Sequence, residues 1–236
     1  MSLELTLMRL ATAPGPWRWL TKRLRGGAVI EGPGVRAEVA LTFDDGPHRG
    51  FTPRVLDALD AIQARATFFV VGRHVEAEPQ LVREMHRRGH EIGTHLYSHA
   101  RETVFQAEAF EGELTRCKRQ LEDLLGAPLR WLRFPYGEHG RQSVDAIEAR
   151  HGVRAAHWTY SSHDSRAPNA ESVSARVVAG LRPGAIVLLH DALADAETLR
   201  PPYVADRNAT ILALPHIGAA LEAQQLRAVT LSELMQ

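Results

Sequence analysis

The stretch EVALTFDDGP, residues 38–47, joins an apolar run to two adjacent carboxylates and a Gly-Pro turn. The apolar part, 38–43, predicts a strand that is buried on both faces, as in a parallel sheet. Asp44 and Asp45 would repel each other unless a cation lay between them. A divalent cation bound by one of them would relieve this repulsion and leave the other as a base. The alternative is an ordinary acidic turn, because Asp and Gly both favour turns.

Outward from this strand, β-like and helical segments alternate to the end of the chain. About seven such alternations without a long linker predict one α/β domain whose parallel sheet closes as a barrel. A chain of 236 residues suits a single domain of this kind. We assign residues 37–236 to the barrel and 1–36 to an N-terminal extension. Strands are predicted at 38–43, 66–71, 91–94, 131–134, 153–158, 185–189 and 228–231, and helices at 52–63, 79–88, 105–125, 142–150, 172–181 and 211–224.

Polar side chains follow several of these strands at their carboxyl ends, where the active residues of a barrel gather. After the third strand the chain reads GTHLYSH, residues 93–99. If this stretch is helical, His95 and His99 lie four residues apart on one face and can reach one ion. With Asp45 they make a three-ligand set that leaves a position open for water. By itself the spacing is weak evidence, because surface histidines also occur at it by chance.

Two further motifs supply groups for acid–base chemistry. RFPYG, residues 133–137, carries Arg133, whose guanidinium can hold the free aspartate ionised, and the backbone N–H of Tyr136, which can point at a developing oxyanion. IVLLHD, residues 186–191, ends an apolar strand with His190, a candidate general acid. The leucines of this strand can form a pocket for a methyl group. Each motif alone also fits a structural role, as a Pro-Gly turn or as a histidine at the edge of the core.

In this order, the motifs resemble those of the NodB-type polysaccharide deacetylases, carbohydrate esterase family 4, over residues 39–231. TFDDGP matches as written, H-[S/T]-x-x-H appears as HLYSH with Leu96 in place of Ser or Thr, R-x-P-Y appears as RFPY, and L-x-H appears as LLH. The stretches at His157 and Trp158 and at 182–186 look like those of rhizobial chitooligosaccharide deacetylases. The resemblance implies the NodB homology domain, a distorted (β/α)7 barrel, in agreement with the alternation of segments.

The resemblance also implies an activity, the metal-dependent hydrolysis of the N-acetyl group of an amino sugar with release of acetate. Zinc is the expected cation, and cobalt or nickel fit the same ligands. Pro135, Tyr136, Leu188 and Trp158 are expected on the substrate side of the site. The implied roles of the other residues are metal ligand for Asp45, His95 and His99, catalytic base for Asp44, orienting cation for Arg133 and general acid for His190.

One motif departs from the family pattern. Where the family has D-x-x-D-W, this chain reads SSHDS, so Ser161 and Ser165 replace the first Asp and the Trp. Family members use this region to tune the acid histidine and to wall the sugar pocket. Asp164 remains and is expected to act with the acid histidine, with His163 as the alternative. The two replacements bear on substrate identity and rate more than on the metal site.

Composition argues against some classes of partner. Lys+Arg and Asp+Glu both total 28, so the formal net charge is zero, and binding of nucleic acid through bulk charge is not expected. The single cysteine, Cys117, cannot form an intrachain disulfide, which fits a reducing compartment, and we expect it buried or half-buried in a helix. The sequence has no evident secretory signal and no apolar run long enough to span a bilayer, so we expect a cytoplasmic protein.

Two segments lie outside the motifs. Residues 17–25, WRWLTKRLR, mix tryptophans and leucines with basic residues. They predict either contact with the cytoplasmic face of a membrane or a helix packed on the domain. The segment 195–208 is expected to be a rim loop that shapes specificity.

The sequence is compatible with three functions. The first is a deacetylase whose substrate is an N-acetylated carbohydrate or glycolipid. The second is a sugar-binding barrel that derives from such an enzyme and has no activity. The third is a hydrolase of a different acetylated substrate. Acetate release from N-acetylated chitooligosaccharides or acetylated glycolipids, with and without a chelator, separates an enzyme from a binding module.

Overall fold

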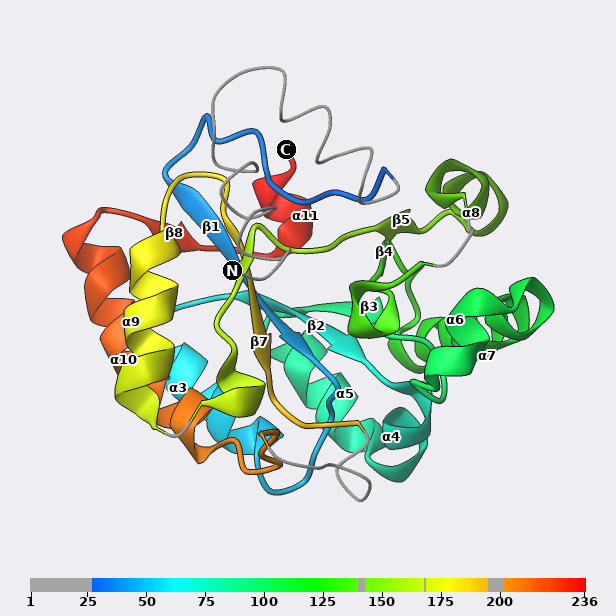
Figure 1. The fold of residues 1–236 in the computed structure, drawn as a ribbon, viewed down its shortest axis with the longest axis horizontal. Coiled ribbons are helices and arrows are strands. Elements are labelled where there is room, and N and C mark those ends of the chain that lie inside the picture. The colour runs from blue at the N-terminus through cyan, green and yellow to red at the C-terminus, as the bar shows by residue number, and fades with distance from the viewer. Residues whose placement is uncertain (1–26, 140–142, 168, 195–201) are drawn as a thin grey trace.

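A computed structural model describes residues 27–139, 143–167, 169–194 and 202–236, so the predicted membrane-contact segment 17–25 lies outside the described residues. The strands are β1 (Glu38–Asp44), β2 (Ala66–Val70), β3 (Glu91–Thr94), β4 (Trp131–Leu132), β5 (Arg154–Ala155), β6 (Tyr160–Ser161), β7 (Ile186–His190) and β8 (Arg227–Ala228). In the described part of the chain they form one parallel sheet in the order β5-β4-β3-β2-β1-β7-β6, and β8 pairs with β1 (Figure 1).

Strand β1 lies at the centre of this sheet. All seven of its residues are buried, and it pairs along its length with β7 and over its carboxyl half with β2. Strand β8 pairs with the amino-terminal part of β1, at Glu38 and Val39, on the same edge of β1 as β2. Because the strands are parallel, their carboxyl ends meet at one rim, where the predicted motifs lie.

The sheet is curled and open, with β5 and β6 at its two ends. The predicted strand 153–158 is paired in the sheet only at Arg154–Ala155. The next residue, Ala156, forms one parallel bridge with Val29 of the segment that precedes β1, since the Val29 N–H donates to the carbonyl oxygen of Ala155 and the His157 N–H donates to that of Val29. The prediction of a distorted α/β barrel is confirmed, and its closure is incomplete at this point.

Helices cover the outside of the curled sheet (Figure 1). Their contacts run from α9 through α10, α3 and α5 to α7, so they form a continuous layer. The α-helices are α3 (Thr52–Ala61), α4 (Gly72–Ala77), α5 (Pro79–Arg87), α6 (Arg101–Phe105), α7 (Ala107–Leu125), α8 (Val144–His151), α9 (Ala170–Gly180), α10 (Asn208–Ala223) and α11 (Leu231–Leu234), and two short 3₁₀ turns are η1 (Pro135–Gly137) and η2 (Asp164–Arg166).

Several predicted elements differ from the observed ones. The helix predicted at 105–125 is interrupted at Gln106, whose extended backbone separates α6 from α7. The last strand, predicted at 228–231, ends early because Thr230 and Glu233 form a capping box that starts α11. The sequence patterns missed α4 and β6, which are too short to show a clear period.

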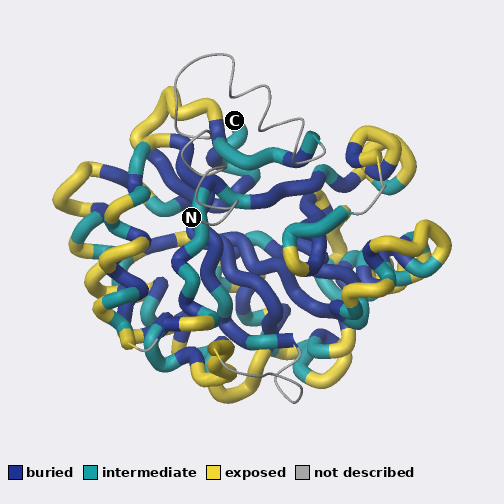
Figure 2. Tube along the Cα trace, viewed as in Figure 1, coloured by how far each residue is buried: buried dark blue, intermediate teal, exposed yellow. Residues whose placement is uncertain are grey.

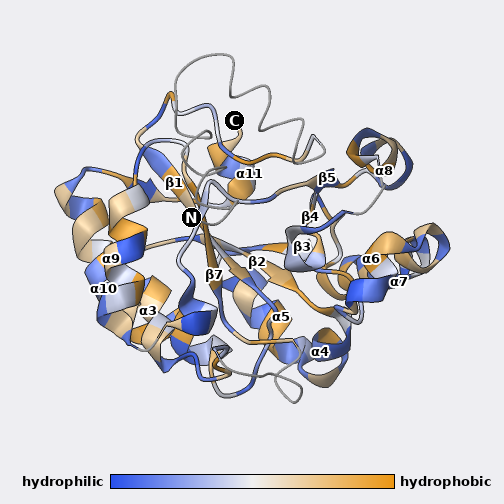
Figure 3. Cartoon of the chain, in the orientation of Figure 1, coloured by the Kyte–Doolittle hydropathy of each residue, from blue (hydrophilic) through white to orange (hydrophobic). Residues whose placement is uncertain are grey.

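The core lies between the helix layer and the sheet. Strands β1 to β4 and β7 are buried along most of their length, and the helices are exposed mainly on their outer faces (Figure 2). Figure 3 shows the matching pattern, with mixed hydrophobic and hydrophilic faces on the outer helices. Cys117 is fully buried in this core, as expected for a free cysteine that packs as a small apolar side chain. No helix in the described ranges is long and apolar enough to span a membrane.

Candidate metal centre and acid–base site

Three side chains able to hold a metal ion converge after the carboxyl ends of β1 and β3. Asp45, His95 and His99 are buried, and one ligand atom of each lies within 4.8 Å of the others. The Oδ1 atom of Asp45 is 3.5 Å from Nε2 of His95 and 3.3 Å from Nε2 of His99. Two imidazole nitrogens and one carboxylate oxygen suit zinc and related divalent cations. The structure thus brings the three predicted ligands together.

The backbone that presents the histidines is not the predicted helix. His95 follows β3, and its N–H donates to the carbonyl oxygen of Val70 at 2.8 Å. Leu96 and His99 each have φ of 63°, in the left-handed region. The chain therefore turns back within this loop, and the two rings meet with centroids 5.0 Å apart. The helix predicted for this stretch is therefore wrong, but the two histidines do converge as predicted.

Hydrogen bonding determines which nitrogen of His95 faces the cluster. Its Nδ1 lies 2.8 Å from the carbonyl oxygen of Arg133, and because a carbonyl only accepts, Nδ1 carries the proton. The lone pair is then on Nε2, the atom nearest to Asp45. Burial, followed by the charge of His99, lowers the pKa of His95 to about 3. A neutral ring with its lone pair on Nε2 is the form that binds a cation, so the residues present fit a metal site.

The backbone of Asp45 is held by a histidine that the sequence motifs did not point to. Asp45 has φ of 78°, a conformation that residues other than glycine rarely adopt. The Nδ1–H of His74, on α4, donates to its carbonyl oxygen at 2.7 Å. The Asp45 N–H donates to the carbonyl oxygen of Phe69 at 3.2 Å. These contacts direct the carboxylate toward the two histidines.

The second aspartate is paired with the predicted arginine. Nη1 of Arg133 lies 2.8 Å from Oδ1 of Asp44, and both side chains are buried. Arg133 also donates to the Thr42 hydroxyl and to the carbonyl oxygens of Ala156 and His157. Burial raises the pKa of Asp44, and the charge and hydrogen bond of Arg133 oppose that shift. The guanidinium therefore favours the ionised carboxylate in a buried setting.

Strand register explains why these groups meet. In the β1–β7 pair, Asp44 lies beside His190, and in the β3–β4 pair, Thr94 lies beside Leu132. The residues that follow the second pair, His95 and Arg133, are therefore neighbours across the rim. Parallel pairing thus assembles the site from motifs that are far apart in the sequence.

On the β7 side, His190 is bound by a buried carboxylate. Its Nδ1 lies 2.7 Å from Oδ1 of Asp164, and its backbone N–H donates to Oδ2 at 2.8 Å. Burial lowers the pKa of His190, but the charge and hydrogen bond of Asp164 outweigh burial and raise it to about 9. The sequence left Asp164 and His163 as alternatives, and the structure places Asp164 on the ring. Ser161 and Ser165, which replace the family's Asp and Trp, flank this contact in the chain.

Two residues from the start of α10 complete the surroundings of Asp164, and the sequence motifs missed both. The Thr210 hydroxyl donates to Oδ2 at 2.8 Å. Nη1 of Arg207, a fully buried guanidinium, is 3.9 Å from the same oxygen. Together with His190 these groups hold the pKa of Asp164 well below its usual range, although its burial acts in the opposite direction. Arg207 belongs to the predicted rim loop 195–208, of which the structure describes the part from 202 onward.

The predicted substrate-side residues surround this cluster. Pro135 is buried, whereas Tyr136 is 48% exposed and its ring centroid is 4.6 Å from that of His99. Trp158 is half-buried and packs on the same turn, since a Cβ atom at Gly137 would lie 2.7 Å from its ring. Leu188 is buried in β7. Their contacts with a substrate stay predictions.

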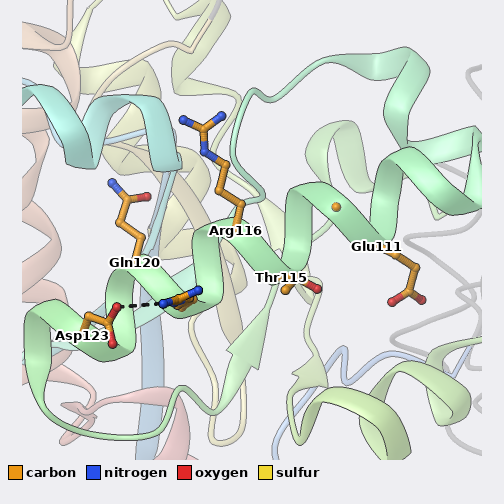
Figure 4. Close-up of a pocket in the computed structure, with 7 residues that line it drawn as sticks. Glu111, Thr115, Arg116, Gln120 and Asp123 are labelled. Atoms are coloured by element: carbon orange, nitrogen blue, oxygen red, sulfur yellow. Dashed lines mark ion pairs between the residues drawn. The ribbon is translucent and has the colours of Figure 1, made fainter.

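A separate surface pocket runs along α7 (Figure 4). It lies between Glu111 and Asp123 and is lined by side chains of both charges, including the ion pair of Arg119 with Asp123. None of the predicted site residues lines it. The candidate site is therefore the cluster at the rim of the sheet.

Comparisons with known proteins identify relatives of this chain. Residues 31–156 match the family model of the polysaccharide deacetylases. A chitooligosaccharide deacetylase from Bradyrhizobium sp. (strain ANU 289) is 36% identical over 185 residues, which cover 78% of this chain and 84% of that protein. A peptidoglycan-N-acetylglucosamine deacetylase from Bacillus cereus is 34% identical over 213 residues, which cover 89% and 94% of the two chains.

Solved structures show the same architecture. The Bc1960 peptidoglycan N-acetylglucosamine deacetylase superposes with a TM-score of 0.80 at 28% identity, covering 94% of this chain and 97% of that one. BA3943 from Bacillus anthracis, a family 4 pseudoenzyme, superposes with a TM-score of 0.75 at 25% identity, covering 88% and 68%. The same fold thus occurs with and without activity, and the side chains of the site must distinguish the two cases.

Proposed function

The chain belongs to the polysaccharide deacetylase family, and on this premise we propose that it removes the N-acetyl group from an N-acetylglucosamine-type sugar by metal-dependent hydrolysis. One observation carries the proposal. The cluster of Asp45, His95 and His99 lies directly beside the Asp44 carboxylate, with His190 on the neighbouring strand. Relatives named as deacetylases of chitooligosaccharides and of peptidoglycan support this substrate class.

We propose zinc as the resident cation, held by Asp45, His95 and His99. A bound divalent cation polarises a carbonyl and lowers the pKa of coordinated water. Three protein ligands would leave a coordination position for water or substrate, as a catalytic zinc site requires. The neutral state of His95 supports this assignment, because a protonated ring cannot bind metal.

Asp44 is proposed as the base that takes the proton of the attacking water. Its Oδ2 lies 3.8 Å from Nε2 of His95, so it borders the ligand cluster without being needed as a ligand. Arg133 occupies the other oxygen, Oδ1, and so orients the carboxylate. This arrangement leaves Oδ2 for the proton transfer.

His190 is proposed as the acid that protonates the departing sugar nitrogen. An amide nitrogen is a poor leaving group until it is protonated. Asp164 binds Nδ1 and stabilises the imidazolium, which leaves Nε2 to deliver the proton. A pKa of about 9 means that the ring carries this proton at neutral pH.

The remaining predicted residues are proposed to receive the acetyl group. The backbone N–H of Tyr136 is assigned to the developing oxyanion, Leu188 to the acetyl methyl group, and Trp158 with Pro135 to the wall of the sugar site. Oxyanion donors act on charge that appears only in the transition state, and each contributes about 10²- to 10³-fold to the rate.

Acetate release from chitooligosaccharides, peptidoglycan fragments and lipid-linked amino sugars tests the proposal and ranks the substrates. Asp44→Asn should bind zinc like the wild type and lose roughly 10²- to 10⁴-fold in kcat, because it removes only the base. Asp45→Ala should lose both zinc and turnover. Zinc content by elemental analysis and acetate by coupled assay are the two measurements. A fully active Asp44→Asn variant would show that another group is the base.

A non-catalytic sugar-binding barrel is the second candidate function. It is favoured by the structural similarity to a pseudoenzyme and by Ser161 and Ser165, which replace two family side chains. The enzyme is preferred because base, acid and three ligands are all present together. Binding of chitooligosaccharides without any acetate release, in the presence of zinc, would favour the binding module.

A further inference from the structure

The loop between the two histidines is held by a side chain outside every sequence motif. Oε2 of Glu113, on α7, accepts the backbone N–H of Tyr97 at 3.0 Å and that of Ser98 at 2.6 Å. We propose that Glu113 is a positioning residue that sets the metal affinity of the site through this loop. The inference rests on the proposed function, because it takes Asp45, His95 and His99 as the metal ligands.

The loop needs an acceptor at this position. Leu96 and His99 adopt left-handed backbone conformations, so the N–H groups between them lie in neither a helix nor a strand. A carboxylate oxygen accepts two such neighbouring donors more strongly than a neutral oxygen does. Where the family usually has Ser or Thr, Leu96 has an apolar, buried side chain that cannot form hydrogen bonds. In this chain the acceptor for the loop N–H groups comes from the neighbouring helix α7.

Tyr97 is held on all sides by α4 and α7. Its N–H is bound by Glu113, and its carbonyl oxygen accepts the N–H of Arg73 at 2.9 Å. Its ring lies under the guanidinium of Arg116, 3.4 Å from ring centroid to Cζ, and its hydroxyl donates to Glu76 at 2.8 Å. The loop therefore has one defined position relative to α7.

The position of the loop determines where His99 points. Ser98, whose N–H is the second donor to Glu113, directly precedes His99 in the chain. His95 has its own anchor, the carbonyl oxygen of Arg133. Glu113 thus supports the other half of the histidine pair. Outer groups that orient metal ligands typically contribute about 10- to 100-fold to metal affinity.

Zinc titration in competition with a chromophoric chelator tests the proposal on the full chain. Glu113→Ala should weaken zinc binding by about 10- to 100-fold. Glu113→Gln keeps one acceptor oxygen without the charge, so its affinity should lie between those of Glu113→Ala and the wild type. Glu111→Ala is the matched control, because Glu111 lies on the same helix but pairs with Arg150 and His151. Its zinc affinity should stay within about twofold of the wild type, a difference of under about 0.5 kcal/mol.

Two further variants and a second signal separate the outcomes. Asp45→Ala should bind no zinc, and if it binds like the wild type, the assignment of the three ligands itself is wrong. If Asp45→Ala loses zinc but Glu113→Ala binds it within twofold of the wild type, the ligand set stands and the role of Glu113 is refuted. The visible spectrum of the Co²⁺ form reports ligand geometry and should change in Glu113→Ala but not in Glu111→Ala. Should Glu113→Ala not fold, the zinc affinity of Glu113→Gln decides, and a value equal to the wild type overturns the proposal.

Discussion

At the scale of single residues, the pair of His190 and Asp164 makes the activity depend on pH. Burial alone lowers the pKa of His190, and Asp164 raises it to about 9. A general acid must be protonated, so kcat should fall as pH rises through about 9. Asp164→Asn removes the charge and leaves the burial, so the alkaline fall of kcat should move toward or below about pH 6.5, the ordinary value for histidine.

A profile of kcat against pH measures this shift. His163→Ala is the control, because His163 was the alternative partner in the sequence and lies beside Asp164 in the chain. The alkaline limb of the kcat profile of His163→Ala should coincide with that of the wild type. An unchanged limb in Asp164→Asn, or a shifted one in His163→Ala, would mean that Asp164 does not set the protonation of the acid.

The residues that sequence reasoning found and those that it missed differ in kind. Asp45, His95 and His99 belong to short motifs with characteristic spacing, so they could be named from the sequence. Glu113 accepts a backbone N–H of a loop that is distant in sequence, and Arg207 lies beside a buried carboxylate that is also distant in sequence. Such contacts depend on packing between elements and leave no local pattern in the chain.

At the scale of elements, the turn after β1 depends on a glycine and on a buried carboxylate. A Cβ atom at Gly46 would overlap the side chain of Asp191, which is fully buried and accepts the hydroxyl of Thr52. Gly46→Ala should therefore lower the free energy of unfolding by about 1–3 kcal/mol, the usual effect of overpacking. Urea denaturation of the wild type and the variant measures it.

Two companion variants show whether the overlap is the cause. A Cβ atom added at Gly112, on α7, would have nothing within 4 Å of it, so Gly112→Ala should instead stabilise by roughly 0.5–1 kcal/mol. In Gly46→Ala/Asp191→Ala the obstructing carboxylate is gone. The double variant should lose less stability than the sum of the two single changes, and strict additivity would contradict a direct contact between these positions.

The helices and strands were predictable where the hydrophobic pattern is clear and extends over many residues. Alternation of apolar strands with amphipathic helices indicated the parallel α/β architecture, and the run 38–43 indicated the central strand. The His95–His99 loop was not predictable, because spacing of four fits a helix and the left-handed residues carry no sequence signal. The bridge between Ala156 and Val29 was not predictable for a different reason, because Val29 is remote in sequence and lies outside the predicted strands.

At the scale of the whole molecule, the metal site joins loops that follow two different strands. Asp45 follows β1, and both histidines follow β3, with β2 between these strands. A cation bound by all three residues would link β1, at the centre of the sheet, to β3, which lies toward the open end of the sheet at β5. Binding to the native state alone stabilises it by about 2.7 kcal/mol when free zinc is about 100 times its Kd.

Thermal unfolding with and without zinc tests this link. For a chain of this size, each kcal/mol of stabilisation raises Tm by about 2–4 °C. Zinc at about 100 times its Kd should therefore raise Tm by about 5–10 °C. Asp45→Ala should show no increase, whereas Asp44→Asn should respond like the wild type, because Asp44 is assigned as the base and not as a ligand. An equal increase in Asp45→Ala would mean that zinc stabilises the fold from another site, and no increase in Asp44→Asn would make that carboxylate a ligand. The same scan therefore tests the division of labour between the two adjacent aspartates independently of any substrate.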